Sequence, residues 1–472
     1  RDSILITGMG LLTPLSAPGA WGGAGGGGGA EGTFAAICAG QAIQNRGIID
    51  PRLLSQTADL QVWRNCGDPY LRQRAQTMLA DPAWDKAIPM GLHVAGQALE
   101  QAEWPATLWQ DPATSFFVGT SKGPVRTWLQ SLSDLRRTGQ LSPTQARQIA
   151  HGPSVIAEVI GEILGMGAGG GRNGGTSGGG KWGGQVHTSV AACSSGMHAL
   201  HRAARALIRG ECRRALVIAS DASADPFFEA SFVNLGVLAP RGADGHRHCH
   251  PLAEPFDKTR AGFILSEGAA AVVLELASDV VARHPGYAPR TWVELEQTWI
   301  GADGTNLVAM DAQTTALRHG LRAVLRNGNA GNSGADALGG GSVWPAGHDT
   351  DGGVGTTLLG TPVDFVHAHA TGTAHDQHEL EAIRTVLPNA HVERPGQHLS
   401  DALPVVFSHK RHLGHSLGAA GLTSVVLSAF CHQAGHTYGG TPLHGAAGER
   451  AGRSISISQG FGGHIGLAVL RG

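Results

Sequence analysis

The chain has 472 residues, of which 42% are hydrophobic, so it can bury a large core and form two or three domain-sized units. Its 35 Lys and Arg residues nearly balance its 37 Asp and Glu residues, which leaves a formal net charge of −2. This balance excludes a global electrostatic attraction to nucleic acid or to an anionic membrane.

Apolar stretches and cysteines indicate the compartment. Stretches such as Ala269–Leu274 are too short to cross a bilayer, and the N-terminus lacks the pattern of a signal peptide. The six cysteines form no CxxC pair and no tight framework, which argues against disulfides in a chain of this length. The sequence therefore predicts a soluble, cytoplasmic protein without a membrane span.

Glycine is unusually frequent, with 71 residues, about twice the usual share of ~7%. The glycines gather in three clumps, at Gly22–Gly29, Gly167–Gly184 and Gly339–Gly355. Such runs have no side chains to bury and lose much backbone entropy when ordered, so we expect loops or insertions there.

Short β-branched runs alternate with helical patterns from the apolar strand Ile4–Ile6 onward. Further strands are predicted at Ser115–Val118, Val186–Ala191, Ala215–Ala219 and Ala270–Leu274. The clearest helix is Ser195–Arg209, with an apolar stripe and Gly210 just past its end. This alternation predicts an α/β protein with buried, largely parallel sheets.

A break in the pattern at Ser278–Pro289 divides the chain, and we expect one half at 1–277 and another at 278–472. The second half repeats the first in outline. Its expected strands are Trp292–Ile300, Phe365–His367, Val405–Ser408 and Ser454–Ser458, and its expected helices are Thr314–Leu325 and Gly418–Ala429.

One cysteine lies where a strand, a turn of small residues and a long helix meet. In Val186–Gly196, the β-rich run leads to Cys193 just before the helix. A helix N-terminus stabilises a thiolate and offers free N–H groups to an oxyanion, so a lowered thiol pKa and a nucleophilic role are predicted. A small buried hydrophobe is the commoner fate of a cysteine taken at random.

Three further segments place polar or aromatic groups at strand ends. Val366–Glu379 carries His369 after an apolar strand, Phe407–Gly421 carries Lys410 five residues before His415, and Ser456–His464 presents Phe461 on a glycine turn. Taken alone, each of these histidines would more often be structural, and the phenylalanine would be assigned to the core.

Together the four segments resemble the elongating β-ketoacyl-acyl carrier protein synthases, which are Cys-His-His enzymes of the thiolase superfamily. Pro255–Ala269 also looks like the loop and strand that close the first half in that family. The resemblance runs from Ile4 to Leu470 with insertions. It implies a thiolase-like fold of two similar α/β halves packed as α-β-α-β-α layers.

The resemblance also implies the site and the reaction. The triad maps to Cys193 in the first half and to His369 and His415 in the second; the family lysine maps to Lys410 and its gating phenylalanine to Phe461. Glu379 matches the acidic residue expected to pair with the lysine. Cys193 would take an acyl group from a carrier thioester, and malonyl-carrier would lose CO2 and add two carbons.

The implied partners are an acyl carrier protein supplied in trans, acyl and malonyl thioesters, and a second subunit in a homodimer or a ketosynthase heterodimer. No cofactor and no metal are expected, and the pathway could be fatty-acid, polyketide or polyene synthesis. The chain departs from the family pattern at Ala370, Ala374 and Ile465, and the loop from Thr373 to Asp376 is one residue short.

Two alternatives stay open. Gly414–Gly418 matches the G-x-S-x-G pattern of serine acyltransferases, which makes Ser416 a rival nucleophile, although six residues separate Gly414 from Phe407 in the preceding strand. A non-catalytic chain-length-type partner subunit is the other alternative, against which the retained triad argues.

Other motifs are weaker. A thiolase would need a second catalytic cysteine near the last strand, and Ser454–Gly463 contains none. Gly8–Thr13 lacks the third glycine of a dinucleotide fingerprint. His246–His250 fits no common zinc spacing.

Overall fold

The structure is a computed structural model that describes residues 2–16, 30–43, 47–50, 54, 57, 60–166, 184–248, 253–285, 292–326, 362–393, 404–443 and 452–472. Apart from Gly184, the three glycine clumps lie outside these residues, as do Cys249 and His250 of the histidine-rich segment.

Eleven strands join into one mixed sheet in the described part of the chain. The strands are β1 (Ile4–Leu12), β2 (Thr114–Gly119), β3 (Val186–Ser189), β4 (Arg214–Asp221), β5 (Gly268–Leu276), β6 (Val293–Ala302), β7 (Val363–His367), β8 (His391–Val392), β9 (Val405–Phe407), β10 (Arg453–Gly460) and β11 (His464–Arg471). Their order across the sheet is β3-β2-β4-β5-β1-β6-β11-β10-β7-β9-β8.

Helices cover the outer faces of this sheet and also lie between its two sets of strands. They are α1 (Ala30–Cys38), α3 (Val62–Asn65), α4 (Leu71–Leu79), α5 (Ala87–Gln101), α6 (Ala106–Trp109), α7 (Val125–Thr138), α8 (Pro143–His151), α9 (Val155–Leu164), α10 (Ser195–Ile208), α11 (Pro226–Asn234), α12 (Ala277–Arg283), α13 (Thr315–Arg326), α14 (His375–Val386), α15 (Lys410–Leu413) and α16 (Ala420–Ala434), with 3-10 turns η2 (Gly152–Ser154) and η5 (Leu417–Ala419).

The strand order contains the same arrangement twice. In the first half, the third, second, fourth, fifth and first strands of that half lie side by side as β3-β2-β4-β5-β1. In the second half, β9-β7-β10-β11-β6 repeats that order, with β8 added at the edge. The two sets meet where β1 pairs antiparallel with β6, at Leu5 with Glu294 and Ile6 with Val293.

The expectation of largely parallel sheets is wrong. β2 pairs parallel with β3 and β4, but β5 runs antiparallel to both β4 and β1, and β11 runs antiparallel to both β10 and β6. Residues 461–463 join β10 to β11 directly, and such a short connection can only produce an antiparallel pair.

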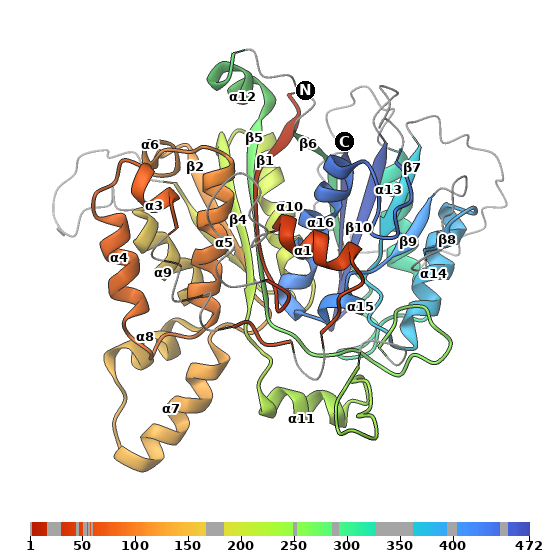
Figure 1. The fold of residues 1–472 in the computed structure, drawn as a ribbon, viewed down its shortest axis with the longest axis horizontal. Helices are drawn as coiled ribbons and strands as arrows, with labels where there is room; N and C mark the ends of the chain where they lie inside the picture. The colour runs from red at the N-terminus through yellow and green to blue at the C-terminus, as the bar shows by residue number, and fades with distance from the viewer. Residues whose placement is uncertain are drawn as a thin grey trace.

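Figure 1 shows the resulting layers. Helices α5 and α9 cover one face of the first set of strands, α10 and α16 lie in the middle, and α13 and α14 cover the outer face of the second set. The central helices contact strands of both halves: α10 packs on β2, β4, β6 and β11, and α16 on β1, β5, β10 and β11. The catalytic candidates all lie at the ends of elements that surround this central layer.

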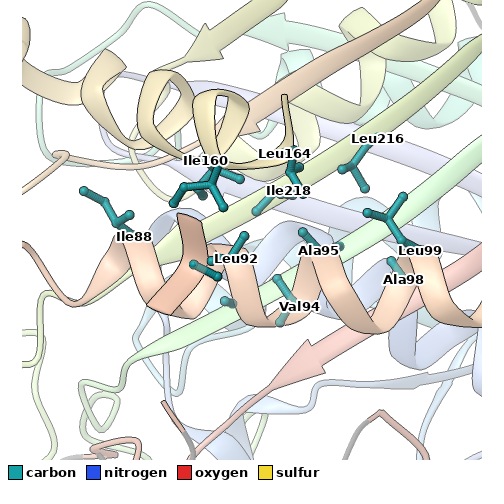
Figure 2. Packing of buried hydrophobic residues seen from close by; sticks show 14 of the residues in the cluster. Ile88, Leu92, Val94, Ala95, Ala98, Leu99, Ile160, Leu164, Leu216 and Ile218 are labelled. Atoms are coloured by element: carbon teal, nitrogen blue, oxygen red, sulfur yellow. The ribbon is translucent and has the colours of Figure 1, made fainter. Parts of the chain in front are cut away.

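The outer packing of the first half explains the glycines near the N-terminus. Figure 2 shows Leu92 of α5 in one buried cluster with Ile160 of α9 and Ile218 of β4. A Cβ on Gly8 would lie 2.0 Å from the Ala98 carbonyl oxygen, and one on Gly10 would lie 2.1 Å from that of Val94. The glycines of the Gly8–Thr13 motif therefore let β1 pack directly on α5.

The stretch formed by η5 and α16 is longer than the apolar stretches expected from the sequence. Within the described residues, Leu417–Ala434 is long and apolar enough to cross a membrane by length and composition, at a mean hydropathy of 1.2. However, 78% of that stretch is buried inside the fold. The expectation about length is wrong, and the central position of α16 accounts for its composition.

Candidate active site

The turn that carries Cys193 is held by its own small residues. Ala192 has a φ of 47°, a left-handed conformation that strains a residue with a Cβ. The Ser195 hydroxyl accepts from the Ala191 N–H at 2.9 Å and donates to the Ala192 carbonyl at 2.6 Å. This clamp fixes Cys193 at the entrance to α10, as the strand-turn-helix pattern predicted, with the side chain 7% exposed.

The end of β10 supports the same turn from the second half of the chain. The Ser458 hydroxyl donates to the Cys193 carbonyl at 3.1 Å. A Cβ on Gly460 would lie 2.9 Å from the Ala191 carbonyl oxygen and 3.0 Å from the Cys193 nitrogen. Only glycine permits this close approach of two backbones, and Phe461 follows directly on the chain.

Cys193 lies in a small apolar cluster with Phe232, Phe263 and Leu265, and Phe461 packs against that cluster. Burial raises the pKa of the Cys193 thiol to about 11, against the opposing effects of the Lys122 and Lys410 charges. The predicted lowering of this pKa is therefore wrong for the unliganded site. Near pH 7 the thiol keeps its proton, so a base would have to remove that proton before the sulfur could act as a nucleophile.

His369 follows β7 and is positioned through its backbone. The Glu379 carboxylate, on α14, accepts from the His369 N–H and from the Ala370 N–H, both at 2.8 Å. The Lys410 ammonium donates to the His369 carbonyl oxygen. Glu379 and Lys410 are both buried, and together they hold the main chain at His369. Their hydrogen bonds to the backbone offset the cost of removing the two charged groups from water.

The second histidine reaches the site from a short bridge between the two halves. The His415 N–H donates to the Ile264 carbonyl at 2.7 Å, and Leu265 pairs with His415. The His415 ring lies 5.4 Å from that of His369 and 5.0 Å from that of Phe263, edge to face in both cases. Phe263 and Leu265 also belong to the apolar cluster that contains Cys193, so His415 contacts that cluster and His369 packs on His415.

Both catalytic histidine candidates are neutral in this environment. Burial lowers the pKa of His369 and of His415 well below its ordinary range, and the Lys410 charge lowers both further. Each ring also has a buried Nδ1 without a hydrogen-bond partner in the described residues. A neutral imidazole can accept a proton at one nitrogen and donate at the other, which suits proton transfer and oxyanion stabilisation.

Lys410 and Glu379 interact differently from the expected direct pair. Lys410 donates to the His369 carbonyl, while both oxygens of Glu379 accept from backbone N–H groups. Desolvation lowers the pKa of Lys410 and raises that of Glu379, and each group's charge opposes the shift of the other. The two side chains therefore act on opposite sides of the same stretch of backbone.

Two stretches of the chain match the models of a known protein family. Residues 174–280 match the family model described as the β-ketoacyl synthase N-terminal domain, and residues 356–440 match the β-ketoacyl synthase C-terminal domain. These two stretches of the chain are therefore similar to the two domains of the β-ketoacyl synthases. The two matched ranges contain Cys193, His369, Lys410 and His415, while Phe461 lies beyond them.

Relatives come from both fatty-acid and polyketide synthesis. The chain is 28% identical over 305 residues to a putative polyketide β-ketoacyl synthase 1 of Streptomyces halstedii, which covers 61% of this chain and 60% of the relative. It is 26% identical over 245 residues to 3-oxoacyl-[acyl-carrier-protein] synthase 2 of Mycobacterium bovis, with 52% of this chain and 47% of the relative covered. The matches thus span about half of each relative's length.

Solved structures share the fold. A β-ketoacyl synthase from Burkholderia phymatum superposes with a TM-score of 0.67 at 17% identity, covering 100% of this chain and 99% of that one. A type II polyketide ketosynthase, in complex with its acyl-carrier protein and bound to the hexaketide, gives a TM-score of 0.66 at 16% identity with the same coverage. The thiolase-like α/β fold is therefore confirmed.

The loop after His369 contains a residue that the sequence analysis did not recognise as important. The Asp376 carboxylate accepts from the N–H groups of Thr371 and Gly372, both at 3.0 Å, and of Phe256 at 3.1 Å. Arg260 adds a donor to the Thr373 carbonyl at 2.7 Å. The shortened Thr373–Asp376 spacing is thus accommodated by a buried carboxylate that anchors the loop.

A second pair of residues near the nucleophile was also missed. Lys122 follows β2, and its charge acts on the Cys193 thiol. Asp221, at the end of β4, accepts from the Ser121 hydroxyl and, at 3.3 Å, from the Gly418 N–H. The only sequence signal was a lysine among small residues directly after a buried strand.

The structure also places Ser416, the histidine-rich segment and the other cysteines, which were the weaker candidates for chemistry. Ser416 is 6% exposed and begins the η5 turn, and a Cβ on Gly268 would lie 2.7 Å from its Cβ. In the histidine-rich segment, His248 lies 2.8 Å from Asp244. Groups of three or more metal-ligating side chains are absent from the described residues. Of the cysteines there, Cys38, Cys66, Cys193, Cys212 and Cys431 are all free.

Proposed function

We propose that the protein catalyses decarboxylative Claisen condensation, in which an acyl group on Cys193 reacts with malonyl-acyl carrier protein to give a β-ketoacyl-acyl carrier protein. The observation that carries the proposal is that the ring of His415, from the second half, packs on Phe263 of the apolar cluster that contains Cys193, and that the ring of His369 packs on His415. The similarity of residues 174–280 and 356–440 to the two β-ketoacyl synthase domains supports the same chemistry.

In the first half-reaction, the Cys193 sulfur attacks the thioester carbonyl of an acyl carrier and the carrier thiol leaves. The proton of Cys193 passes to a neutral imidazole and then to the departing carrier sulfur, so the site ends with its starting charge. We propose that the N–H group of Cys193, just before α10, binds the oxygen that becomes negative, since those of Ser194 and Ser195 donate to the carbonyls of Ala191 and Ala192. We propose that the Phe461 N–H serves this oxyanion as well.

In the second half-reaction, malonyl-carrier loses CO2 and leaves an enolate. Donation from His369 and His415 to the thioester oxygen stabilises the negative charge, for which a neutral, buried imidazole is suited. The enolate carbon then attacks the acyl-enzyme carbonyl. A carbon–carbon bond forms, the bond from Cys193 sulfur to the acyl carbon breaks, and the released thiolate takes up one proton from water.

We propose roles for the supporting residues as well. Lys410 and Glu379 fix the backbone at His369, and Lys410 keeps both histidines neutral. Phe461, which packs on Phe232 at a ring distance of 6.4 Å, closes the acyl cluster from the β10 turn. Residues 1–277 and 278–472 are the proposed thiolase-like halves, which the repeated strand order supports.

The proposed partners are an acyl carrier protein acting in trans and a second subunit in a homodimer or ketosynthase heterodimer. Support comes from solved relatives described as a ketosynthase complexed with its acyl-carrier protein and as a ketosynthase/chain length factor. A cytoplasmic location is part of the proposal, supported by the free cysteines among the described residues.

Intact mass measurement tests the function. The parent chain and the variants Cys193→Ala and Ser416→Ala are incubated with a medium-chain acyl-carrier thioester, and malonyl-carrier is then added. We expect label on the parent and on Ser416→Ala, none on Cys193→Ala, and elongation only after malonyl-carrier. Label lost only in Ser416→Ala would identify a serine acyltransferase, and no label on any chain would favour a non-catalytic partner subunit.

A further inference from the structure

A second lysine, Lys122, lies beside the nucleophile, in the loop between β2 and α7. Its ammonium lies 5.2 Å from the ring centre of Phe228 and 5.6 Å from that of Phe232, both on α11. It donates to the Ser121 hydroxyl at 3.1 Å, and that hydroxyl in turn donates to Asp221. Lys122 is thus held in place by two aromatic faces and one neutral acceptor.

The ammonium has hydrogen-bonding capacity to spare. A lysine carries three N–H donors, and Ser121 accounts for one of them. Among the described residues, Lys122 forms no ion pair with a carboxylate, whereas Lys86 pairs with Glu267 and Lys410 binds the His369 carbonyl. Lys122 is half-buried, and the aromatic faces compensate for only part of the hydration that its ammonium has lost. Such a cation favours a ligand that is an anion or a strong hydrogen-bond acceptor.

The position of Lys122 relative to the triad indicates which ligand that is. Its charge acts on Cys193 and on His415, whereas the charges acting on His369 come from Lys410, His415 and His375. Phe232, beneath the ammonium, belongs to the same cluster as Cys193. Lys122 therefore lies on the side of the thiol that the α11 aromatics surround.

The carboxylate of the malonyl unit is a poor candidate for this cation. That carboxylate leaves as neutral CO2, so a cation bound to it would stabilise the starting state more than the transition state and would slow the reaction. Oxygen atoms remain on the carrier arm and on the acyl group that Cys193 carries, and the acyl group is the one that begins within the cluster that contains Phe232.

We propose that Lys122 recognises an oxygen atom on the acyl chain bound to Cys193, so that the enzyme selects chains with an oxo or carboxylate oxygen over fully reduced alkyl chains. This inference rests on the proposed function. Lys122 acts here as a specificity-determining residue that contacts substrate, and the oxygen can belong to a 3-oxo group or to a terminal carboxylate. Both present an acceptor to the same ammonium.

Competition among acyl donors of equal length tests the inference. Hexanoyl, 3-oxohexanoyl and 5-carboxypentanoyl carrier thioesters are offered in turn, and the rate of Cys193 acylation is followed by intact mass. The variants are Lys122→Met, which removes the charge at similar length, and Lys122→Arg, which keeps it. Lys258→Met is the matched control, since Lys258 is an exposed lysine on another loop.

We expect the parent to prefer one or both oxygen-bearing donors over hexanoyl by about tenfold or more, which corresponds to about 1.4 kcal/mol. Lys122→Met abolishes that ratio, Lys122→Arg retains most of it, and Lys258→Met leaves it unchanged. The ratio is informative because any effect of the missing charge on the Cys193 thiol changes all three rates alike. Which donor loses its advantage tells whether the oxo or the carboxylate oxygen is bound.

Two results would overturn the inference while leaving the condensing function intact: a parent that acylates all three donors at equal rates, or a Lys122→Met variant that slows all three equally. The second result would assign Lys122 to the carrier arm or to the thiol. Failure of the parent to form any acyl-Cys193 would reject the proposed function, and the inference with it.

Discussion

Replacing Gly460 with alanine should disturb the nucleophile turn directly. The new Cβ would lie 2.9 Å from the Ala191 carbonyl oxygen, 3.0 Å from the Cys193 nitrogen and 3.1 Å from the Ser194 nitrogen. All three atoms are backbone, and β10 lies between β7 and β11 in the middle of its half, so neither side can move away easily. We expect a loss of about 1–3 kcal/mol in the free energy of unfolding.

The same substitution should also reduce the rate of acylation. A shift of several tenths of an ångström at Cys193 changes the approach of the sulfur to the thioester, and a misplacement of ~1 Å can cost about a hundredfold in rate. We therefore expect acylation of Cys193 in Gly460→Ala to slow by about ten- to a hundredfold. Urea unfolding gives the stability, and intact mass at timed intervals gives the rate.

Gly161→Ala, in α9, is the matched control for this substitution. A Cβ there meets nothing closer than a side-chain methyl of Val186 at 3.5 Å. Alanine also favours a helix interior by about 0.5–1 kcal/mol over glycine, so this variant should be equally or more stable and fully active. An unchanged acylation rate in Gly460→Ala would refute the idea that β10 sets the position of the thiol.

Three further predictions concern pH and the loop after β7. Because the pKa of the Cys193 thiol is raised to about 11, its alkylation by iodoacetamide should accelerate about tenfold per pH unit from 7 to 10, and a plateau near pH 8 would contradict this. Burial lowers the pKa of His93, His412 and His432 to about 4 from 6.5. The unfolded chain therefore takes up these protons first, so the free energy of unfolding in urea should fall as pH falls from 6.5 to 4, by roughly 3 kcal/mol for each histidine; a flat profile would contradict it. Asp376→Asn replaces an acceptor by a donor facing buried N–H groups and should cost about 1–3 kcal/mol in the same assay together with a loss of elongation, whereas equal stability would show that the loop does not depend on the carboxylate.

Much of the fold was predictable because its strands and central helices carry strong local patterns. The expected helix Ser195–Arg209 and strand Trp292–Ile300 correspond to α10 and β6 within two residues at their ends. Strand direction was not predictable in the same way. The apolar run of β5 is compatible with either direction, and its antiparallel pairing is determined by the long connection after β4, which periodicity does not reveal.

The site was predictable to the extent that its chemistry is concentrated in short motifs. Cys193, His369 and His415 each follow a strand and lie among small residues, and these segments meet in the structure. Lys122 and Asp376 lack such a signal, because what matters for each is a contact across the fold: the α11 aromatics for one, and the Phe256 N–H for the other. The partner of Lys410 was also misassigned, since a backbone carbonyl carries no sequence signature.

The error about the thiol pKa has the same origin as the neutrality of the histidines. A strand-turn-helix pattern reveals the helix N-terminus that favours a thiolate, but it does not reveal how completely the turn is covered by Phe232, Phe263 and the β10 turn. That cover disfavours every charge in the site: it raises the pKa of Cys193 and lowers those of His369 and His415. The resting site therefore contains a thiol and two neutral imidazoles, with Lys410 as the buried cation beside them. A neutral imidazole can take the proton of the thiol and return it to the leaving sulfur. The thiol and the two imidazoles can therefore stay uncharged until a thioester carbonyl is bound, and negative charge then develops on its oxygen.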